Sequence, residues 1–195
     1  MALVVITGAA RSGKSAAAQR LAHARAGRGV EVVVAVFGVA QGDAEFAARI
    51  ERHRTERPTE FRALEAGDSR SWRKSVPDEA VLVVECLGTL AALMMGEATG
   101  DLDTDTYETE LESALDGALA EFVAWVSRRS GDTIVVTNET GWGVVPAYAS
   151  GRVFRDALGR ANTVFVTIAD AAYLAVNGRV LDLGALPRDV SWPSD

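Results

Sequence analysis

Residues 8–15 read Gly-Ala-Ala-Arg-Ser-Gly-Lys-Ser and match the whole phosphate-binding pattern G-x-x-x-x-G-K-[ST]. The residues before them, Leu-Val-Val-Ile-Thr at 3–7, are typical of a buried strand, and the alanine-rich residues 15–22 favour a helix. A strand, a glycine-rich loop and a helix in this order direct backbone N–H groups and a helix N-terminus at an anion. A glycine-rich loop that arose by chance would have no reason to lie between a predicted strand and a predicted helix. The stretch therefore predicts a P-loop that binds a nucleoside triphosphate.

The pattern also predicts a role for each part of the loop. The nucleotide-binding residues are expected to be Gly8, Ala9, Ala10, Arg11, Ser12, Gly13, Lys14 and Ser15. Lys14 is expected to act in catalysis by reaching the β- and γ-phosphates, and the Ser15 hydroxyl to ligate Mg²⁺. Glu85 closes an apolar run, where P-loop proteins usually keep an acid that holds Mg²⁺ directly or through water. A solvated carboxylate at a strand end is the alternative for Glu85.

Composition predicts the class of protein around this loop. With 195 residues, the chain is expected to form one α/β domain over residues 1–195. The net charge of −7 argues against nucleic acid as a partner. No apolar run approaches the roughly 20 residues that span a bilayer. The single cysteine, Cys86, fits a reducing compartment. The P-loop begins too early in the chain to follow a cleavable leader, so we expect the protein in the cytoplasm.

Hydrophobic patterning predicts alternating strands and helices. Apolar runs typical of buried strands occupy residues 30–36, 80–85 and 133–137, and a shorter strand is expected at 59–65. Helices are predicted at 43–54, 87–95, 107–129 and 147–163. Two short runs flank Asn177-Gly178, which predicts a C-terminal hairpin with a type I′ turn. This order indicates a mostly parallel sheet, with ligands at the carboxyl ends of its strands.

Two further sites allow more than one interpretation. His53 falls on the apolar stripe of its predicted helix between Arg49 and Arg57, so it could be a nucleophile toward phosphate or a structural capping histidine. Residues 138–146 place two glycines around Trp142 just after a buried strand, which fits either a ligand-approaching loop or a tight structural turn. The arginines of the helix that follows could form a salt-bridged surface or face a phosphate: Arg152, Arg155 and Arg160.

Taken together, these strings resemble the adenosylcobinamide kinase / adenosylcobinamide-phosphate guanylyltransferase family of cobalamin biosynthesis. The resemblance runs from the first strand to about Ala169. It rests on residues 6–15, on 45–50 followed by His53 and Arg57-Pro58, on Glu85-Cys86, on 137–146, and on 154–162.

The resemblance implies two reactions. ATP or GTP phosphorylates the aminopropanol hydroxyl of adenosylcobinamide, and GMP from GTP then joins that phosphate to give adenosylcobinamide-GDP and pyrophosphate. It further implies that His53 carries the guanylyl group, that Glu85 orders Mg²⁺, and that Arg57 and Glu65 belong to the nucleotide site. The implied fold is a P-loop α/β sheet of the RecA-like kind, assembled as a homotrimer.

The sequence departs from the family pattern at residues 37–40, at 61–63, and at Arg52, Gly88 and Ala147. Two other functions remain as alternatives. A P-loop kinase of another small alcohol would use Lys14, Ser15 and Glu85 but leave His53 without a role. A nucleotide-dependent switch protein would hydrolyse slowly without a small acceptor.

Overall fold

The structure is a computed structural model that describes residues 1–37, 55, 57–99 and 107–190. A seven-stranded sheet forms its centre, in the order β3-β2-β4-β5-β1-β6-β7. Neighbouring strands pair in parallel, except that β7 runs antiparallel to β6. The strands are β1 (Leu3–Gly8), β2 (Val32–Phe37), β3 (Arg62–Ala66), β4 (Val81–Glu85), β5 (Thr133–Val136), β6 (Ala171–Val176) and β7 (Arg179–Asp182).

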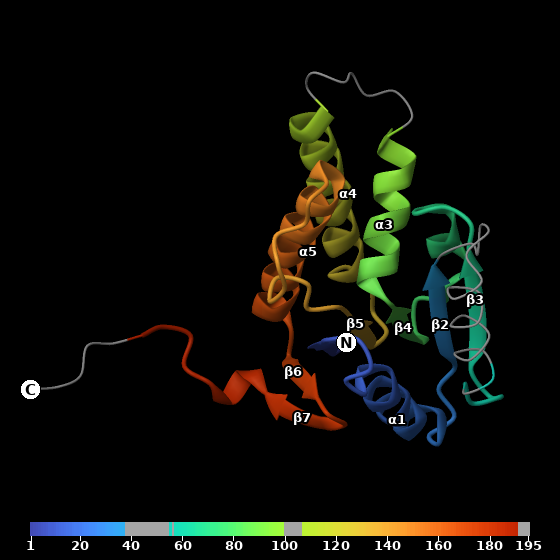
Figure 1. Cartoon of the computed structure of the whole chain (residues 1–195). Helices are drawn as coiled ribbons and strands as arrows, with labels where there is room; N and C mark the ends of the chain where they lie inside the picture. The colour runs from blue at the N-terminus through green and yellow to red at the C-terminus, as the bar shows by residue number, and fades with distance from the viewer. Residues whose placement is uncertain (38–54, 56, 100–106, 191–195) are drawn as a thin grey trace, which may run out of the picture.

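Helices cover both faces of this sheet (Figure 1). One face packs against α1 (Lys14–Ala26), and the other lies under α3 (Leu87–Ala98), α4 (Tyr107–Val126) and α5 (Ala149–Ile168). Short 3-10 turns are η1 (Ser71–Ser75) and η3 (Leu183–Ala185). Each face has its own apolar cluster, the larger one lying under the three helices. The valine-rich β2 is covered on both sides, which explains its nearly continuous apolar sequence.

The P-loop strand β1 lies inside the sheet, between β5 and β6. Glu85 ends β4, which is separated from β1 by β5 alone. The predicted P-loop α/β fold with a mostly parallel sheet is therefore confirmed. Among the described helices, none has the length and apolar character that a membrane span requires.

The C-terminal hairpin is confirmed, and it also extends the parallel sheet. Asn177 and Gly178 have φ values of 50° and 78°, as a type I′ turn requires. β6 pairs with β7 on one side and with β1 on the other, from Val4 opposite Ala171 to Gly8 opposite Ala175. The pairing with β1 could not be predicted from the hairpin pattern alone.

The helices differ from their predicted bounds mainly at their ends. The helix predicted at 147–163 runs over Ala149–Ile168, because Phe165 packs fully buried in the core and keeps the valine-rich end helical. The predicted helix at 43–54 lies outside the described residues.

Candidate active site at the P-loop

The P-loop has the backbone form that an anion-binding loop needs. Gly13, just before α1, has a φ of 96°, and Arg11 has a φ of 58°. The N–H of Ser12 donates to the carbonyl of Ala9 at 3.3 Å and tightens the loop. Lys14 is the first residue of α1 and is only 6% exposed, and its Nζ donates to the Ala9 carbonyl at 3.0 Å. Its ammonium group is therefore held against the backbone of the predicted phosphate-binding loop.

The C-terminal hairpin touches one side of the loop. The Gly178 N–H donates to the Ser12 carbonyl at 2.8 Å. A Cβ on Gly13 would lie 3.0 Å from Cα of Gly178, and a Cβ on Gly8 would lie 2.5 Å from the carbonyl oxygen of Ala175. Both P-loop glycines are thus required by the close approach of β6 and its turn. The Asn177-Gly178 turn could be predicted from the sequence, but its contact with the P-loop could not.

On the other side, a polar network holds the residues after β5. The Glu139 N–H donates to the Gly8 carbonyl at 3.1 Å. The buried Asn162 of α5 accepts from Thr137 Oγ1 at 2.6 Å and donates to the Asn138 carbonyl at 3.0 Å. Asn162, one of the residues that carries the family resemblance, therefore fixes the start of the 138–146 loop beside the P-loop. This positioning role could not be derived from its spacing.

The two predicted acidic residues lie in one row across the sheet. Ile6, Val136, Glu85, Val36 and Glu65 are register partners on neighbouring strands. Register partners in parallel strands point to the same face, and the apolar members of the row belong to the cluster under α1. Two strand spacings, about 10 Å, separate the backbones of Glu85 and Ile6, and four, about 19 Å, separate Glu65 from Ile6. The half-buried Glu85 is thus near the P-loop, whereas Glu65 is exposed on the edge strand.

A magnesium ion fits the residues at the P-loop only if the nucleotide supplies further ligands. Ser15 and Glu85, the predicted ligands, offer one hydroxyl and one carboxylate, and both residues are half-buried. Within the described ranges, no three His, Cys, Asp or Glu side chains form a metal-binding group. Mg²⁺ usually takes one or two protein ligands and completes its shell with phosphate oxygens and water. The donor set therefore fits a nucleotide-bound ion.

The second group of predicted residues is described only in part. His53 lies outside the described residues. Arg57 is half-buried, and its Nε makes no hydrogen bond within the part of the chain that the structure describes. His23, the other histidine, is a surface residue whose Nδ1 lies 2.8 Å from Glu60 Oε1. Cys86, the single cysteine, is buried and free.

The arginines of α5 form a salt-bridged surface, which decides between the two interpretations left open by the sequence. Arg152 pairs with Glu108 at 3.0 Å, and Arg155 pairs with Asp156 at 2.7 Å. Arg160 pairs with Glu112 and Asp116 of α4 at 2.7 and 2.9 Å.

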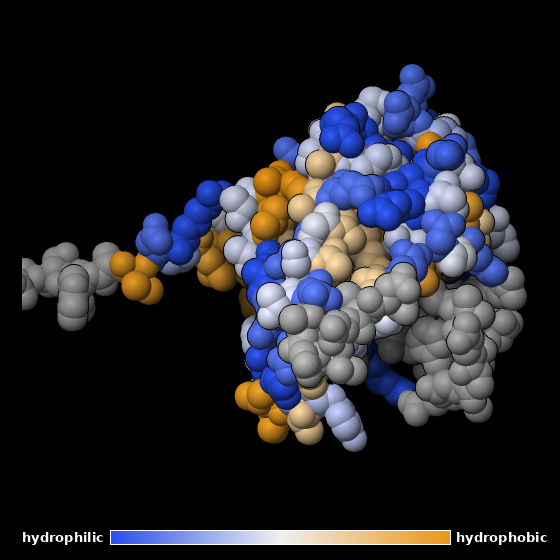
Figure 2. All heavy atoms as spheres, turned by 90° about the horizontal axis from the view of Figure 1, so that it is seen from above, coloured by the Kyte–Doolittle hydropathy of each residue, from blue (hydrophilic) through white to orange (hydrophobic). Residues whose placement is uncertain are grey.

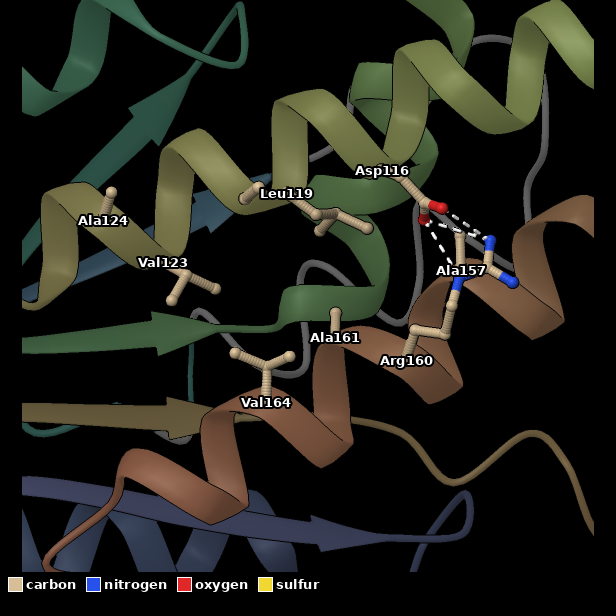
Figure 3. Close-up of a pocket in the computed structure, with 9 residues that line it drawn as sticks. Asp116, Leu119, Val123, Ala124, Ala157, Arg160, Ala161 and Val164 are labelled. Carbon is tan, nitrogen blue, oxygen red and sulfur yellow. Dashed lines mark hydrogen bonds and ion pairs between the residues drawn. The ribbon is translucent and has the colours of Figure 1, made fainter.

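Beside Arg160, a cavity of about 300 Å³ opens between α4 and α5 (Figure 3). Its apolar lining includes Leu119, Val123 and Ala161, and the Asp116–Arg160 pair lies at one end. Apart from Arg160, no residue that the sequence suggested for a functional site lines this cavity. It is therefore separate from the site at the P-loop.

The sheet order and the loop geometry define an α/β protein of the P-loop class, with its P-loop at the carboxyl edge of a parallel sheet. A solved structure with a similar fold is a prototypical ATPase from the type III secretion system of pathogenic bacteria, with a TM-score of 0.55 and 11% sequence identity. The match covers 89% of this chain and 50% of that one. At this identity the likeness concerns the fold alone.

The sequence comparisons are more specific. The family model described as cobinamide kinase / cobinamide phosphate guanyltransferase matches residues 4–183, and the chain belongs to this family of transferases. The bifunctional adenosylcobalamin biosynthesis protein CobU of Escherichia coli is 34% identical over 90% of this chain and 96% of the relative. The protein of the same name from Salmonella typhimurium is 33% identical with the same coverage. The bifunctional adenosylcobalamin biosynthesis protein CobP of Pseudomonas aeruginosa is 30% identical over 94% and 98%.

Proposed function

We propose that the protein phosphorylates the aminopropanol hydroxyl of adenosylcobinamide and then transfers GMP from GTP to the new phosphate. ATP or GTP serves the first reaction, and the second releases pyrophosphate and yields adenosylcobinamide-GDP. The observation that carries this proposal is the complete P-loop, with Lys14 folded onto it, in a chain that matches the kinase and guanyltransferase family over residues 4–183. The kinase-only and switch-protein alternatives have no comparable support.

In the kinase step, the hydroxyl oxygen of the corrinoid side chain attacks the γ-phosphorus and its proton passes to water. The bond from that phosphorus to the bridging oxygen breaks, and the nucleoside diphosphate leaves. The backbone N–H groups of residues 8–15 and the Lys14 ammonium offset the negative charge on the phosphates. Ser15 and Glu85 would hold Mg²⁺, which when bound neutralises the β- and γ-oxygens. Because Lys14 is buried at the start of a helix, its charge acts where water screens it least.

In the guanylyl step, an imidazole nitrogen of His53 attacks the α-phosphorus of GTP, and pyrophosphate leaves. A phosphate oxygen of the corrinoid then attacks the same phosphorus, and the P–N bond breaks. This route divides one displacement into two, each with its own attacking group. Arg57 and Glu65 would bind the nucleotide during this step. The assignment of His53, Arg57 and Glu65 rests on the family resemblance.

Labelling tests the two steps separately. With GTP labelled at the α-phosphate, we expect an acid-labile, base-stable adduct on the wild type and on His23→Ala, and none on His53→Ala. With ATP labelled at the γ-phosphate, we expect label in the corrinoid with Lys74→Ala but not with Lys14→Ala. His23 and Lys74 are the only other histidine and lysine in the chain, so they are matched controls. A wild type that forms neither product with adenosylcobinamide would overturn the proposal.

We infer further that the single domain of residues 1–195 works in the cytoplasm as a homotrimer. The lone cysteine supports the compartment. Both apolar clusters flank one sheet, which supports a single domain. The free edge strand β7 supports association, because Val180 and Leu181 are 48% and 56% exposed. Figure 2 shows apolar side chains gathered where the C-terminal segment leaves the body. Light scattering tests the assembly, and Leu181→Glu is expected to yield monomers.

A further inference from the structure

The segment that follows β5 presents an unusual group of exposed apolar side chains. Trp142 is 76% exposed, Val144 94%, Val145 62% and Tyr148 81%. We refer to these four residues as the apolar loop. Large apolar side chains gathered on one short segment usually mark a binding surface.

The apolar loop is anchored at both ends. Its start follows Glu139, whose N–H donates to the Gly8 carbonyl at the first residue of the P-loop pattern. At its other end, Nη1 of Arg152 donates to the carbonyls of Pro146 at 3.4 Å and Ala147 at 3.1 Å. The exposed side chains are therefore carried on a backbone tied to the P-loop at one end and to α5 at the other.

The strand order decides which side of the P-loop is available to an acceptor. On the β6 side, the hairpin turn contacts the loop through the Gly178 N–H and the Ser12 carbonyl. On the β5 side lie Glu85, at the end of β4, and the apolar loop. An acceptor hydroxyl must reach the terminal phosphate near the predicted metal ligand Glu85. The β5 side therefore offers the acceptor hydroxyl a path to the terminal phosphate beside Glu85.

We propose that the apolar loop is the docking surface for the corrin ring of the acceptor. This inference rests on the proposed function. A corrin is a broad macrocycle with a rim of methyl groups and amide side chains, so it needs an accessible, mostly apolar surface with a few hydrogen-bonding groups. Trp142 offers a flat indole between two glycines, and a Cβ on Gly143 would meet no atom within 4 Å. The indole N–H and the Tyr148 hydroxyl can bond to the rim amides.

The position of the apolar loop, as well as its composition, indicates the corrin ring as its ligand. Three residues before Trp142, the Glu139 N–H donates to the Gly8 carbonyl, so a ring resting on the apolar loop can send a flexible side chain to the phosphate site. The edge strand β7, to which we assign the contact with a second copy, pairs with β6 on the other side of β1. The two apolar surfaces therefore have different occupants and can be tested separately.

Equilibrium dialysis of adenosylcobinamide against wild type, Trp142→Ala and Tyr148→Ala tests the assignment. We expect the Kd for the corrinoid to rise about ten-fold in Trp142→Ala, as for other ligands that stack on an aromatic ring. The KM for ATP should change less than two-fold. The control is Ile168→Ala, which removes an apolar side chain that is 43% exposed at the end of α5, and it should bind the corrinoid like the wild type.

Three results would overturn the inference or its basis, and they are distinguishable. If the wild type neither binds nor phosphorylates adenosylcobinamide, the proposed function fails. If the wild type does both and Trp142→Ala keeps the same corrinoid Kd, the docking surface lies elsewhere. If Trp142→Ala changes the molar mass measured by light scattering, the apolar loop is a contact between subunits and the inference is wrong.

Discussion

Gly8→Ala tests how closely the P-loop approaches the C-terminal hairpin. The added Cβ would lie 2.5 Å from the Ala175 carbonyl oxygen, roughly 0.9 Å short of an ordinary contact of 3.4 Å, and 2.7 Å from Ser12 Oγ. The serine hydroxyl can rotate away, but the carbonyl belongs to β6 and moves only with that strand. Overpacking of this kind costs about 1–3 kcal/mol. Since 1 kcal/mol corresponds to about 2–4 °C in a chain of this size, we expect Tm to fall by about 2–12 °C.

Thermal unfolding followed by circular dichroism measures this change, and Gly67→Ala is its control. A Cβ on Gly67 would meet no atom within 4 Å, and its φ is not positive, so we expect its Tm to be unchanged or slightly raised. The Kd for ATP should also rise in Gly8→Ala, because the displaced loop carries the N–H groups that we propose bind the phosphates. Equal Tm values for the two variants would refute the close approach of the P-loop to β6.

Three further changes test the packing around the site. Asn162→Ala leaves the buried Thr137 hydroxyl without its acceptor and should cost about 1–3 kcal/mol, seen as a fall in Tm of about 2–12 °C. Arg129→Ala removes a buried guanidinium that donates to three backbone carbonyls, and we expect it to lower Tm by about 4–16 °C. Glu121→Gln tests the stability of the fold in acid. The hydrogen bond from Arg70 lowers the pKa of Glu121 below its usual 4.5. The ionised Glu121 therefore stabilises the fold above that pH, and this contribution is lost as the pH falls below it. The Tm of the wild type should therefore decrease more than that of Glu121→Gln between about pH 5 and pH 3.

Each of these variants has a matched control. Thr163→Ala, an exposed neighbour of Asn162 on α5, should keep the wild-type Tm within about 2 °C. Arg128→Ala is the control for Arg129→Ala, and Glu79→Gln is the control for Glu121→Gln. Both residues are exposed, so we expect neither substitution to change the Tm by more than about 2 °C. An Asn162→Ala or Arg129→Ala variant as stable as its control would contradict the assigned hydrogen bonds. Parallel acid profiles for Glu121→Gln and wild type would remove Glu121 from the account of acid stability.

Much of this molecule could be predicted from local sequence. The glycines of residues 8–15 permit the backbone angles of a P-loop, and the β-branched runs favour extended strands. The P-loop, the buried strands and the Asn177-Gly178 turn therefore follow from residue type over a few residues. The alternation of strands and helices further favours a parallel sheet, since a helix between two strands supplies the crossover that parallel strands need. The family resemblance added chemical roles, above all for His53, that no periodicity contains.

Only the tertiary structure decided which of these pieces meet. It paired β6 with β1, and it placed Asn162 beneath the loop after β5. It also paired the α5 arginines with acids, two of them with acids of α4, and it separated Glu65 from the P-loop strand by three other strands. These outcomes depend on contacts between residues far apart in the chain. Burial and hydrogen bonding select such contacts, whereas local conformational preference does not encode them.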